Sequence, residues 1–301
     1  RHFDRLGTML VQLDDEDALD ALAARPGTRG VYADIVMHKT AIADGLDVIG
    51  QPVALSRGYG GAGTTVAVLD TGVDYTRAAF GSCAAAGAAG CRVVHAEDFA
   101  PDDAALDEDG HGTNVAGIVA TVAPQADIAA LDIFAGDRAS ASDVLAAIEW
   151  VLNNRGRLNI VAMNMSIGTD HAFSSPCDLG VFASPIDRAL TAGVVPVISS
   201  GNEGASNGIS APGCVSSALT VGATYGMPVS SLRTSICSDT NAAVDEVACF
   251  SNASATLDIL APGVGINAAG LSQLLARDHG ITVVGEAYDW DGVAHVPMRR
   301  G

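Results

Sequence analysis

Four nearly continuous apolar runs recur after residue 65, and each is as long as a short β-strand. The runs are Val66–Leu69, Ile128–Ile133, Ile160–Met165 and Val194–Ile198. A strand in a parallel sheet is covered on both faces, so it is apolar along its whole length and not only at alternate positions. The four runs therefore predict a parallel sheet that is buried on both faces.

Segments that favour helices lie between these runs. One begins at Ser142-Asp143 and ends at Gly156, and another begins at Ser184-Pro185 and ends at Gly193. A third, Thr113–Ala120, consists mainly of small residues that let a helix approach a sheet closely. This alternation predicts an α/β fold, namely a doubly wound, mostly parallel sheet flanked by helices.

Two stretches depart from the alternation. Residues 1–40 contain two predicted strands, Met9–Leu13 and Gly30–Ile35, around a predicted helix at Asp14–Ala24. Because so short a segment buries little apolar surface alone, we expect a small α+β unit that packs on the rest of the chain. Residues 204–252 are rich in turn-forming residues and are expected to be mostly loop.

Three polar residues of catalytic type stand beside glycines near the ends of apolar segments. Asp70 follows Val66–Leu69, His111 begins a predicted helix, and Asn202 follows Gly201 after a strand. Alone, each has an ordinary explanation as a helix cap, a surface turn residue or a turn asparagine. Their order on different elements of one α/β domain favours a shared site with an acid, a base and an amide donor.

Two further segments could form binding sites. Ser166-Ile167-Gly168 follows the strand at Ile160–Met165 and could offer its backbone to an extended peptide, although it could also be a plain exit from the strand. The glycine cluster Gly58–Gly63 precedes its strand, whereas a dinucleotide-binding loop follows one. A nucleotide site is therefore a poor interpretation of these glycines.

These motifs resemble those of the subtilase family (peptidase S8), the subtilisin-like serine proteases. They are Asp-Thr-Gly-Val at residues 70–73, His-Gly-Thr-Asn-Val-Ala-Gly at 111–117, Ser-Ile-Gly at 166–168, Ser-Gly-Asn at 200–202 and Leu-Ala-Pro-Gly at 260–263. The resemblance lies within residues 41–270 of a peptidase domain assigned to residues 41–301. It implies a hydrolase that cleaves extended peptide or protein substrates by a Ser-His-Asp mechanism.

The resemblance also implies a role for each site residue. Asp70 would orient the imidazole, His111 would act as general base and then general acid, and Asn202 would bind the oxyanion. Ser166-Ile167-Gly168 and Gly201 would line the substrate cleft. The implied enzyme works as a monomer on a peptide or protein substrate.

Residues 1–40 resemble the end of the family's inhibitory propeptide. The chain would then be a zymogen that carries its own intramolecular inhibitor, with cleavage near Thr40–Asp44. The family and the cysteines described below also imply a secreted, extracellular protein. Residue 1 is arginine and no leader is present, so we expect any signal peptide to lie upstream or to have been removed.

The nucleophile is the one part of the family pattern that is missing. The family places it in Gly-Thr-Ser-x-Ala-x-Pro, and no Gly-Thr pair of this chain is followed by serine. Ser272 is the only substitute, but it lies close to Pro262 and between Leu271 and Leu274. We therefore expect a serine endopeptidase chain that is inactive, and the alternative is a non-catalytic, peptide-binding pseudoprotease. A truncated or frame-altered gene would also explain residues 271–301.

Charge and hydropathy narrow the set of partners. The chain has 35 acidic and 16 basic residues and a net charge of −19, which disfavours nucleic acid and anionic membranes. No apolar run approaches the about 18 residues that a membrane span needs. We expect a soluble protein without a nucleic-acid or membrane partner.

Six cysteines fall into three pairs of neighbours and include no Cys-x-x-Cys motif. Pairing neighbours would give the disulfides Cys83–Cys91, Cys177–Cys214 and Cys237–Cys249, which would place the protein in an oxidising compartment. Other pairings, or buried free thiols, are the alternatives. The absence of Cys-x-x-Cys argues against a zinc or redox motif.

Acidic residues cluster just before His111, and we interpret them as a solvated loop rather than a calcium site. The cluster consists of Asp102, Asp103, Asp107, Glu108 and Asp109. No cofactor or metal site is predicted, and structural calcium is suggested only by the family. Asn164 and Asn252 lie in glycosylation sequons, of which Asn164 falls in a predicted buried strand.

Overall fold

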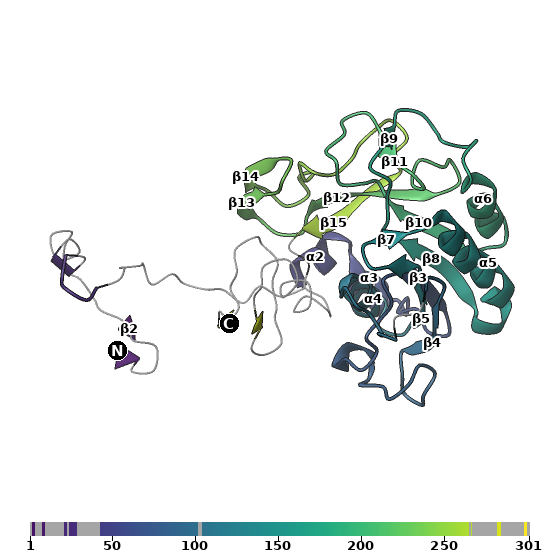
Figure 1. Cartoon of the computed structure of the whole chain (residues 1–301), viewed down its shortest axis with the longest axis horizontal. Helices are drawn as coiled ribbons and strands as arrows, with labels where there is room; N and C mark the ends of the chain where they lie inside the picture. Colours follow the sequence, from purple (N-terminus) through teal and green to yellow (C-terminus); the bar gives the residue numbers. More distant parts are fainter. Residues whose placement is uncertain are drawn as a thin grey trace. The chain divides into compact units, whose positions relative to one another are not determined.

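The computed structural model describes residues 43–101, 104–264 and 266, together with residues 2–3, 8–9, 21–22, 24–28, 282–283 and 298–299 (Figure 1). The chain divides into two compact units, Arg1–Thr40 and Ala41–Gly301. In the first unit β1 (His2–Phe3) pairs antiparallel with β2 (Thr8–Met9). Most of the elements predicted for residues 9–35 lie outside the described residues.

A seven-stranded sheet organises the second unit, and all of its neighbouring strands are parallel. This confirms the predicted doubly wound α/β fold. In spatial order the strands are β15 (Ile259–Val264), β12 (Leu219–Tyr225), β10 (Val195–Ser199), β8 (Ile160–Met165), β3 (Thr65–Asp70), β5 (Asp127–Asp132) and β4 (Val93–Asp98).

Helices cover both faces of this sheet (Figure 1). On one face, α5 (Ala141–Leu158) and α6 (Ala183–Thr191) pack on Ala67 and Leu69 of β3. On the other face, α4 (His111–Val122) packs on Val68. Successive residues of one strand thus belong to two different cores, which explains why the strand is apolar throughout.

The four apolar runs are all strands, but burial on both faces is complete only near the centre of the sheet. In β3 and β5 five of six residues are buried. In β8 and β10, however, Val161 is 37% exposed and Val195 is 38% exposed. The prediction of burial on both faces was therefore too broad for these two strands, each of which has one exposed valine near its start.

Helix ends differ from prediction by a few residues. Ser140, not Ser142, caps α5, because its Oγ accepts a hydrogen bond from the Asp143 N–H at 3.3 Å. The helix also continues past Gly156 to Leu158 and is capped by Asn159, which has a left-handed backbone with φ of 51°. One internal glycine costs a helix only about 1 kcal/mol, which packing of the buried face offsets.

Residues 204–252 contain more regular structure than predicted. Leu219–Tyr225 forms β12, and β13 (Val229–Arg233) pairs with β14 (Ser238–Ala242) as an antiparallel hairpin. β12 escaped prediction because Thr, Gly and Ala interrupt its apolar residues. Tyr225 is fully buried at the centre of a third core beside this hairpin.

Shorter elements complete the second unit. Helices α2 (Ala43–Val48) and α3 (Gln51–Ser56) precede the sheet, and the Gln51 side-chain amide donates to the Thr121 carbonyl near the end of α4 at 3.2 Å. The remaining elements are η1 (Ala78–Phe80), β6 (Phe134–Ala135), β7 (Arg138–Ala139), β9 (Ala172–Phe173), β11 (Ile209–Ser210), β16 (Thr282–Val283) and β17 (Met298–Arg299).

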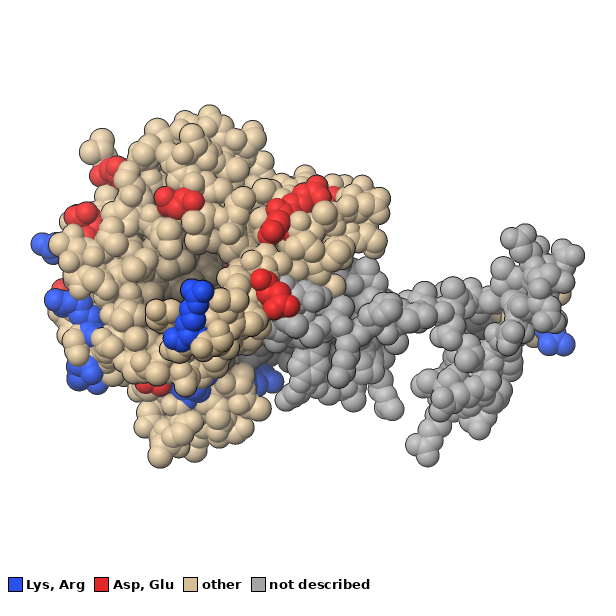
Figure 2. Space-filling view, turned by 180° about the vertical axis from the view of Figure 1, so that it is seen from behind, with Lys and Arg blue, Asp and Glu red and all other residues tan. Residues whose placement is uncertain are grey.

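The surface carries its charge in small groups. On the face shown in Figure 2, acidic side chains form separate small clusters on a mostly uncharged surface, and basic side chains lie at the left margin, near the centre and along the lower edge. Within the part of the chain that the structure describes, no helix is both long and apolar enough to cross a membrane.

Three disulfides join the neighbouring cysteines, in the pairing expected from the sequence. They are Cys83–Cys91, Cys177–Cys214 and Cys237–Cys249, with sequence separations of 8, 37 and 12 residues. A disulfide stabilises a fold mainly by restricting the unfolded chain, and this effect grows with loop length. The Cys177–Cys214 bridge, which joins the segment before α6 to the segment before β12, therefore restricts the unfolded chain most.

We expect the double substitution Cys177→Ser/Cys214→Ser to lower the free energy of unfolding by about 4 kcal/mol. The matched control Cys83→Ser/Cys91→Ser, which opens the shortest loop, should lower it by about 2.5 kcal/mol. Urea unfolding at pH 7 measures both variants. A larger loss for the control would contradict this assignment.

Candidate active site

The candidate site lies at the carboxyl edge of the sheet, where the direction of strand addition reverses. From β3 the chain first adds β5 and β4 on one side and then β8 and β10 on the other. Such a reversal opens a crevice at the carboxyl ends of the strands, where α/β proteins bind ligands. Asp70 ends β3, Ser166 directly follows β8, and Asn202 follows β10.

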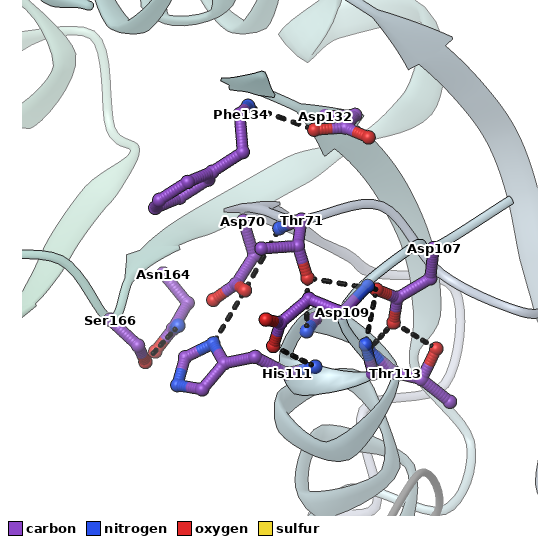
Figure 3. Close-up of polar contacts among 12 residues, drawn as sticks. Asp70, Thr71, Asp107, Asp109, His111, Thr113, Asp132, Phe134, Asn164 and Ser166 are labelled. Atoms are coloured by element: carbon purple, nitrogen blue, oxygen red, sulfur yellow. Dashed lines mark hydrogen bonds and ion pairs between the residues drawn. The ribbon is translucent and has the colours of Figure 1, made fainter. Parts of the chain in front are cut away.

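Asp70 and His111 are in direct contact at this edge. The His111 Nδ1 atom lies 2.6 Å from the Asp70 Oδ1 atom (Figure 3). Asp70 is fully buried, whereas the His111 side chain is 42% exposed. An ionised carboxylate selects the tautomer with its proton on Nδ1, so the Nε2 atom is left as a proton acceptor. Because the imidazole is partly exposed, this acceptor is available to a ligand.

A third residue, Asp107, ties the start of α4 to the end of β3. Its Oδ1 atom accepts hydrogen bonds from the Thr71 hydroxyl at 2.9 Å and the Gly110 N–H at 2.7 Å. Its Oδ2 atom accepts from both the N–H and the hydroxyl of Thr113. The Thr71 hydroxyl in turn accepts from the Gly112 N–H at 2.9 Å. These bonds fix the helix turn that carries His111 against the strand that carries Asp70 (Figure 3).

The interpretation of the acidic cluster as a solvated loop was wrong for Asp107. This residue is only 7% exposed and lies at the centre of the bonds just described. Glu108 is exposed as expected, while Asp102 and Asp103 lie outside the described residues. Sequence reasoning missed Asp107 because a carboxylate that caps a helix and one that is solvated occur in the same acidic runs.

Two glycines permit this close approach. A Cβ atom on Gly112 would overlap the Gly72 carbonyl oxygen, and one on Gly72 would overlap the Leu106 carbonyl oxygen. Gly72 also has a left-handed backbone with φ of 86°. A side chain at Gly112 would push α4 away from the end of β3, and one at Gly72 would displace the segment before α4, so either would disturb the contact between Asp70 and His111.

Burial by itself lowers the pKa of His111, but the neighbouring carboxylates outweigh it. The charge of Asp70, its hydrogen bond to the imidazole and the charge of Asp107 together raise the pKa of His111 above its ordinary value of 6.5. The pair therefore stabilises the fold most below pH 6.5, where the imidazole is charged. That contribution is lost as the pH rises through the folded-state pKa.

Asp132 is a second buried carboxylate at this edge, and sequence reasoning missed it. It ends β5 directly opposite Asp70 of β3. Burial is the main cause that raises the pKa of Asp132 to about 7, and the charges of Glu108, Asp98 and Asp107 add to it. A hydrogen bond from the Phe134 N–H, at 2.9 Å, partly opposes these effects. The missed signal was an acid that interrupts the apolar run Ile128–Ile133.

The residues expected to line the cleft follow β8 and β10. The Asn164 side-chain amide donates to the Ser166 hydroxyl at 3.0 Å, and Figure 3 shows this pair at the strand ends beside Asp70 and His111. Asn164 stands opposite Val68, so Ser166 lies level with the end of β3. The Ser199 hydroxyl donates to the Ile167 carbonyl at 3.1 Å, which joins the ends of the two strands.

Asn202 is exposed just beyond β10 and follows Gly201, whose φ is 108°. It therefore stands at the same sheet edge as Asp70, two strands away from β3. Ser272 lies outside the described residues. Among the described residues, no serine hydroxyl hydrogen-bonds to His111. Within that same part of the chain, no group of three or more His, Cys, Asp or Glu side chains could hold a metal ion.

Comparisons with known proteins point to a single family. The model of the subtilase family matches residues 61–287. Alkaline elastase YaB from Bacillus sp. is 31% identical over 276 residues, which are 88% of this chain and 62% of that protein. Subtilisin-like protease 3 from Pseudogymnoascus destructans is 35% identical over 217 residues, which are 69% of this chain and 46% of that protein.

A solved structure, that of a cold-adapted subtilisin-like serine proteinase, has the same fold. Its TM-score is 0.52 at 24% sequence identity, over 74% of this chain and 79% of that chain. Subtilisin E from Bacillus subtilis is 29% identical over 266 residues, which cover 84% of this chain and 61% of that protein. The chain thus spans less than two thirds of the length of the curated relatives named here.

Replacing Asp70 by Asn should lower the pKa of His111, because the variant removes the carboxylate charge that raises it. An NMR titration of the imidazole resonances measures this change. His95, which keeps its Glu97 partner at 2.9 Å, serves as the internal control. An unchanged His111 titration would contradict the proposed electrostatic coupling.

Replacing Asp132 by Asn should stabilise the protein above pH 7 and have little effect near pH 4. Because folding raises the pKa of this carboxyl to about 7, the folded protein loses stability as the pH rises from about 4 to about 7. The Asn side chain keeps the acceptor for the Phe134 N–H. Urea unfolding at pH 4, 6 and 8 measures the difference, and a difference that does not vary with pH would refute the assignment.

Proposed function

This chain belongs to the subtilase family of serine peptidases, and we propose that its site is that of a serine endopeptidase for extended peptide substrates. The single observation that carries the proposal is the 2.6 Å contact between His111 and the buried Asp70 at the crevice of the sheet. The relatives indicate the type of reaction, which is the cleavage of peptide bonds. We propose the same reaction for this chain, which covers only part of the length of those relatives.

The residues have distinct roles in the proposed reaction. Asp70 holds the proton on the Nδ1 atom of His111 and stabilises the imidazolium that forms. The Nε2 atom takes the proton of a serine hydroxyl as that oxygen attacks the peptide carbonyl, and it then gives the proton to the leaving amine. The Asn202 amide donates to the negatively charged oxygen of the tetrahedral intermediate. Ser166-Ile167-Gly168 and Gly201 line the substrate cleft.

We further propose that the chain does not turn over peptides in this form. The family's nucleophile motif is missing from the sequence, and Ser272 is the only substitute. An acid–base pair without a nucleophile cannot form the covalent intermediate, although the cleft still binds extended peptides. The same features support the alternative of a peptide-binding pseudoprotease.

The remaining parts of the proposal come from the family and the cysteines. We propose a secreted, monomeric protein in which residues 1–40 act as an intramolecular inhibitor. Three disulfides in the second unit support an oxidising compartment. No cofactor is proposed, and structural calcium remains a proposal from the family alone.

We expect the folded chain not to react with a fluorophosphonate probe and to bind an extended peptide, measured by fluorescence anisotropy. Labelling that disappears in both Ser272→Ala and His111→Ala would establish a working serine and overturn the proposed inactivity. Folding of both variants is checked by circular dichroism. If the chain neither labels nor binds peptide, the proposed cleft is wrong.

A further inference from the structure

Asn252 is a buried polar residue that has no role in the predicted fold or in the proposed reaction. It is fully buried and lies 50 residues beyond Asn202. Although it begins a glycosylation sequon, its side chain is enclosed and bonded at both ends. Every hydrogen bond of its side chain leads to one short segment, residues 200–205, or to Ser210.

The carbonyl end of Asn252 holds the backbone that follows Asn202. Its Oδ1 atom accepts hydrogen bonds from the Glu203 N–H at 3.2 Å and the Ala205 N–H at 2.8 Å. The backbone of Asn252 adds a further bond, from its N–H to the Gly201 carbonyl at 3.0 Å. One residue thus bonds to the chain on both sides of Asn202.

The amide end of Asn252 completes the arrangement. Its Nδ2 atom donates to the Glu203 Oε2 atom at 2.5 Å, to the Ser210 hydroxyl at 3.1 Å and to the Ser200 carbonyl at 3.2 Å. The Ser210 hydroxyl donates to the same Glu203 oxygen at 2.9 Å. Bonds to an ionised carboxylate are stronger than bonds between neutral groups, so Glu203 anchors the cluster.

The cluster formed by the side chains of Asn252, Glu203 and Ser210 packs directly against Gly201. A Cβ atom on Gly201 would clash with Asn252 Nδ2, Ser210 Oγ and Glu203 Oε2. The backbone at Gly201 therefore packs on the three polar groups without a side chain between them. The turn that carries Asn202 is thus fixed from below, while Asn202 itself is exposed.

We propose that Asn252, with Glu203, is the positioning residue that fixes the Gly201–Ala205 turn and so aims the Asn202 amide as an oxyanion donor. The inference rests on the proposed function, because it assigns Asn202 that role. A donor is effective only if it is held in place before the charge develops. Among the residues that the structure describes, none forms a hydrogen bond with the Asn202 side chain, so the cluster holds Asn202 through the backbone.

The first test is hydrogen exchange measured by NMR on the full chain. We expect Asn252→Ala to speed exchange of the Glu203 and Ala205 amides about tenfold and to shift the side-chain NH₂ resonances of Asn202. Ser251→Ala is the matched control, since Ser251 is also buried but its hydroxyl bonds to no residue of the 200–205 segment. It accepts from the Ala223 N–H at 2.9 Å and donates to the backbone carbonyl of Asn252 at 3.4 Å, so it leaves the Asn252 side chain untouched. We expect the control to leave the turn unchanged.

The second test exchanges the two partners. Asn252→Asp keeps the acceptor for the Glu203 and Ala205 amides but places a carboxylate against Glu203, so the turn should loosen. Adding Glu203→Gln places an amide donor at position 203 opposite the new carboxylate at position 252. We expect this second change to return the Asn202 resonances toward those of the parent chain. A general loss of stability would not be rescued in this way.

The outcomes separate this inference from the proposed function. If Asn252→Ala leaves the Glu203 and Ala205 amides and the Asn202 resonances unchanged, or if the exchange of partners gives no rescue, the positioning role is wrong. If those results appear as expected but the chain binds no peptide and does not label, the turn is held by Asn252 and the proposed endopeptidase site is the part that fails.

Discussion

The buried carboxylate of Asp107 is the constraint on which the rest of the site depends. It accepts hydrogen bonds from the end of β3 through Thr71 and from the start of α4 through Gly110 and Thr113. A buried carboxylate is expensive unless hydrogen bonds satisfy it, and burial does raise the pKa of Asp107. These hydrogen bonds offset the cost of burial. They also set the distance between α4 and β3, which brings the His111 imidazole into contact with the Asp70 carboxylate.

Negative charge accumulates at this edge because parallel strands end there together. Asp98, Asp132 and Asp70 end three adjacent strands, and Asp107 lies beside them. The fold separates their tasks by their partners. Asp70 faces an imidazole, Asp107 faces backbone and hydroxyl donors, and Asp132 faces other carboxylates, which together with burial raises its pKa to about 7. Carboxylates of one type thus serve as the partner of an imidazole, a structural cap and a group that ionises only near neutral pH.

On the other side of the crevice, the side-chain amide of Asn252 fixes a turn, as the carboxylate of Asp107 does beside His111. Asn252 bonds to the turn after β10 much as Asp107 bonds to the turn before α4. In both places a buried polar side chain satisfies N–H groups of a glycine-containing turn, although Asp107 belongs to its own turn and Asn252 comes from a distant segment. The N–H groups of Gly110 and Ala205 lie outside helix and sheet, so they need another partner, and the buried side chains supply it. The exposed residues of the site are therefore held by buried ones.

The sequence by itself determined the parallel sheet, the order of the motifs and the residues Asp70, His111 and Asn202, since strand ends and glycine-flanked polar residues are local signals. It gave no sign of β12, whose apolar residues are interrupted by Thr, Gly and Ala, and it misplaced the cap of α5 by two residues. Only the tertiary structure decided which acids are buried and what they touch. Asp107, Asp132 and Asn252 look like ordinary polar residues along the chain, because distant segments decide what surrounds them. Asp107 accepts a hydrogen bond from Thr71, 36 residues away, and Asn252 from Glu203, 49 residues away, while Asp132 lies beside Asp70 on the neighbouring strand.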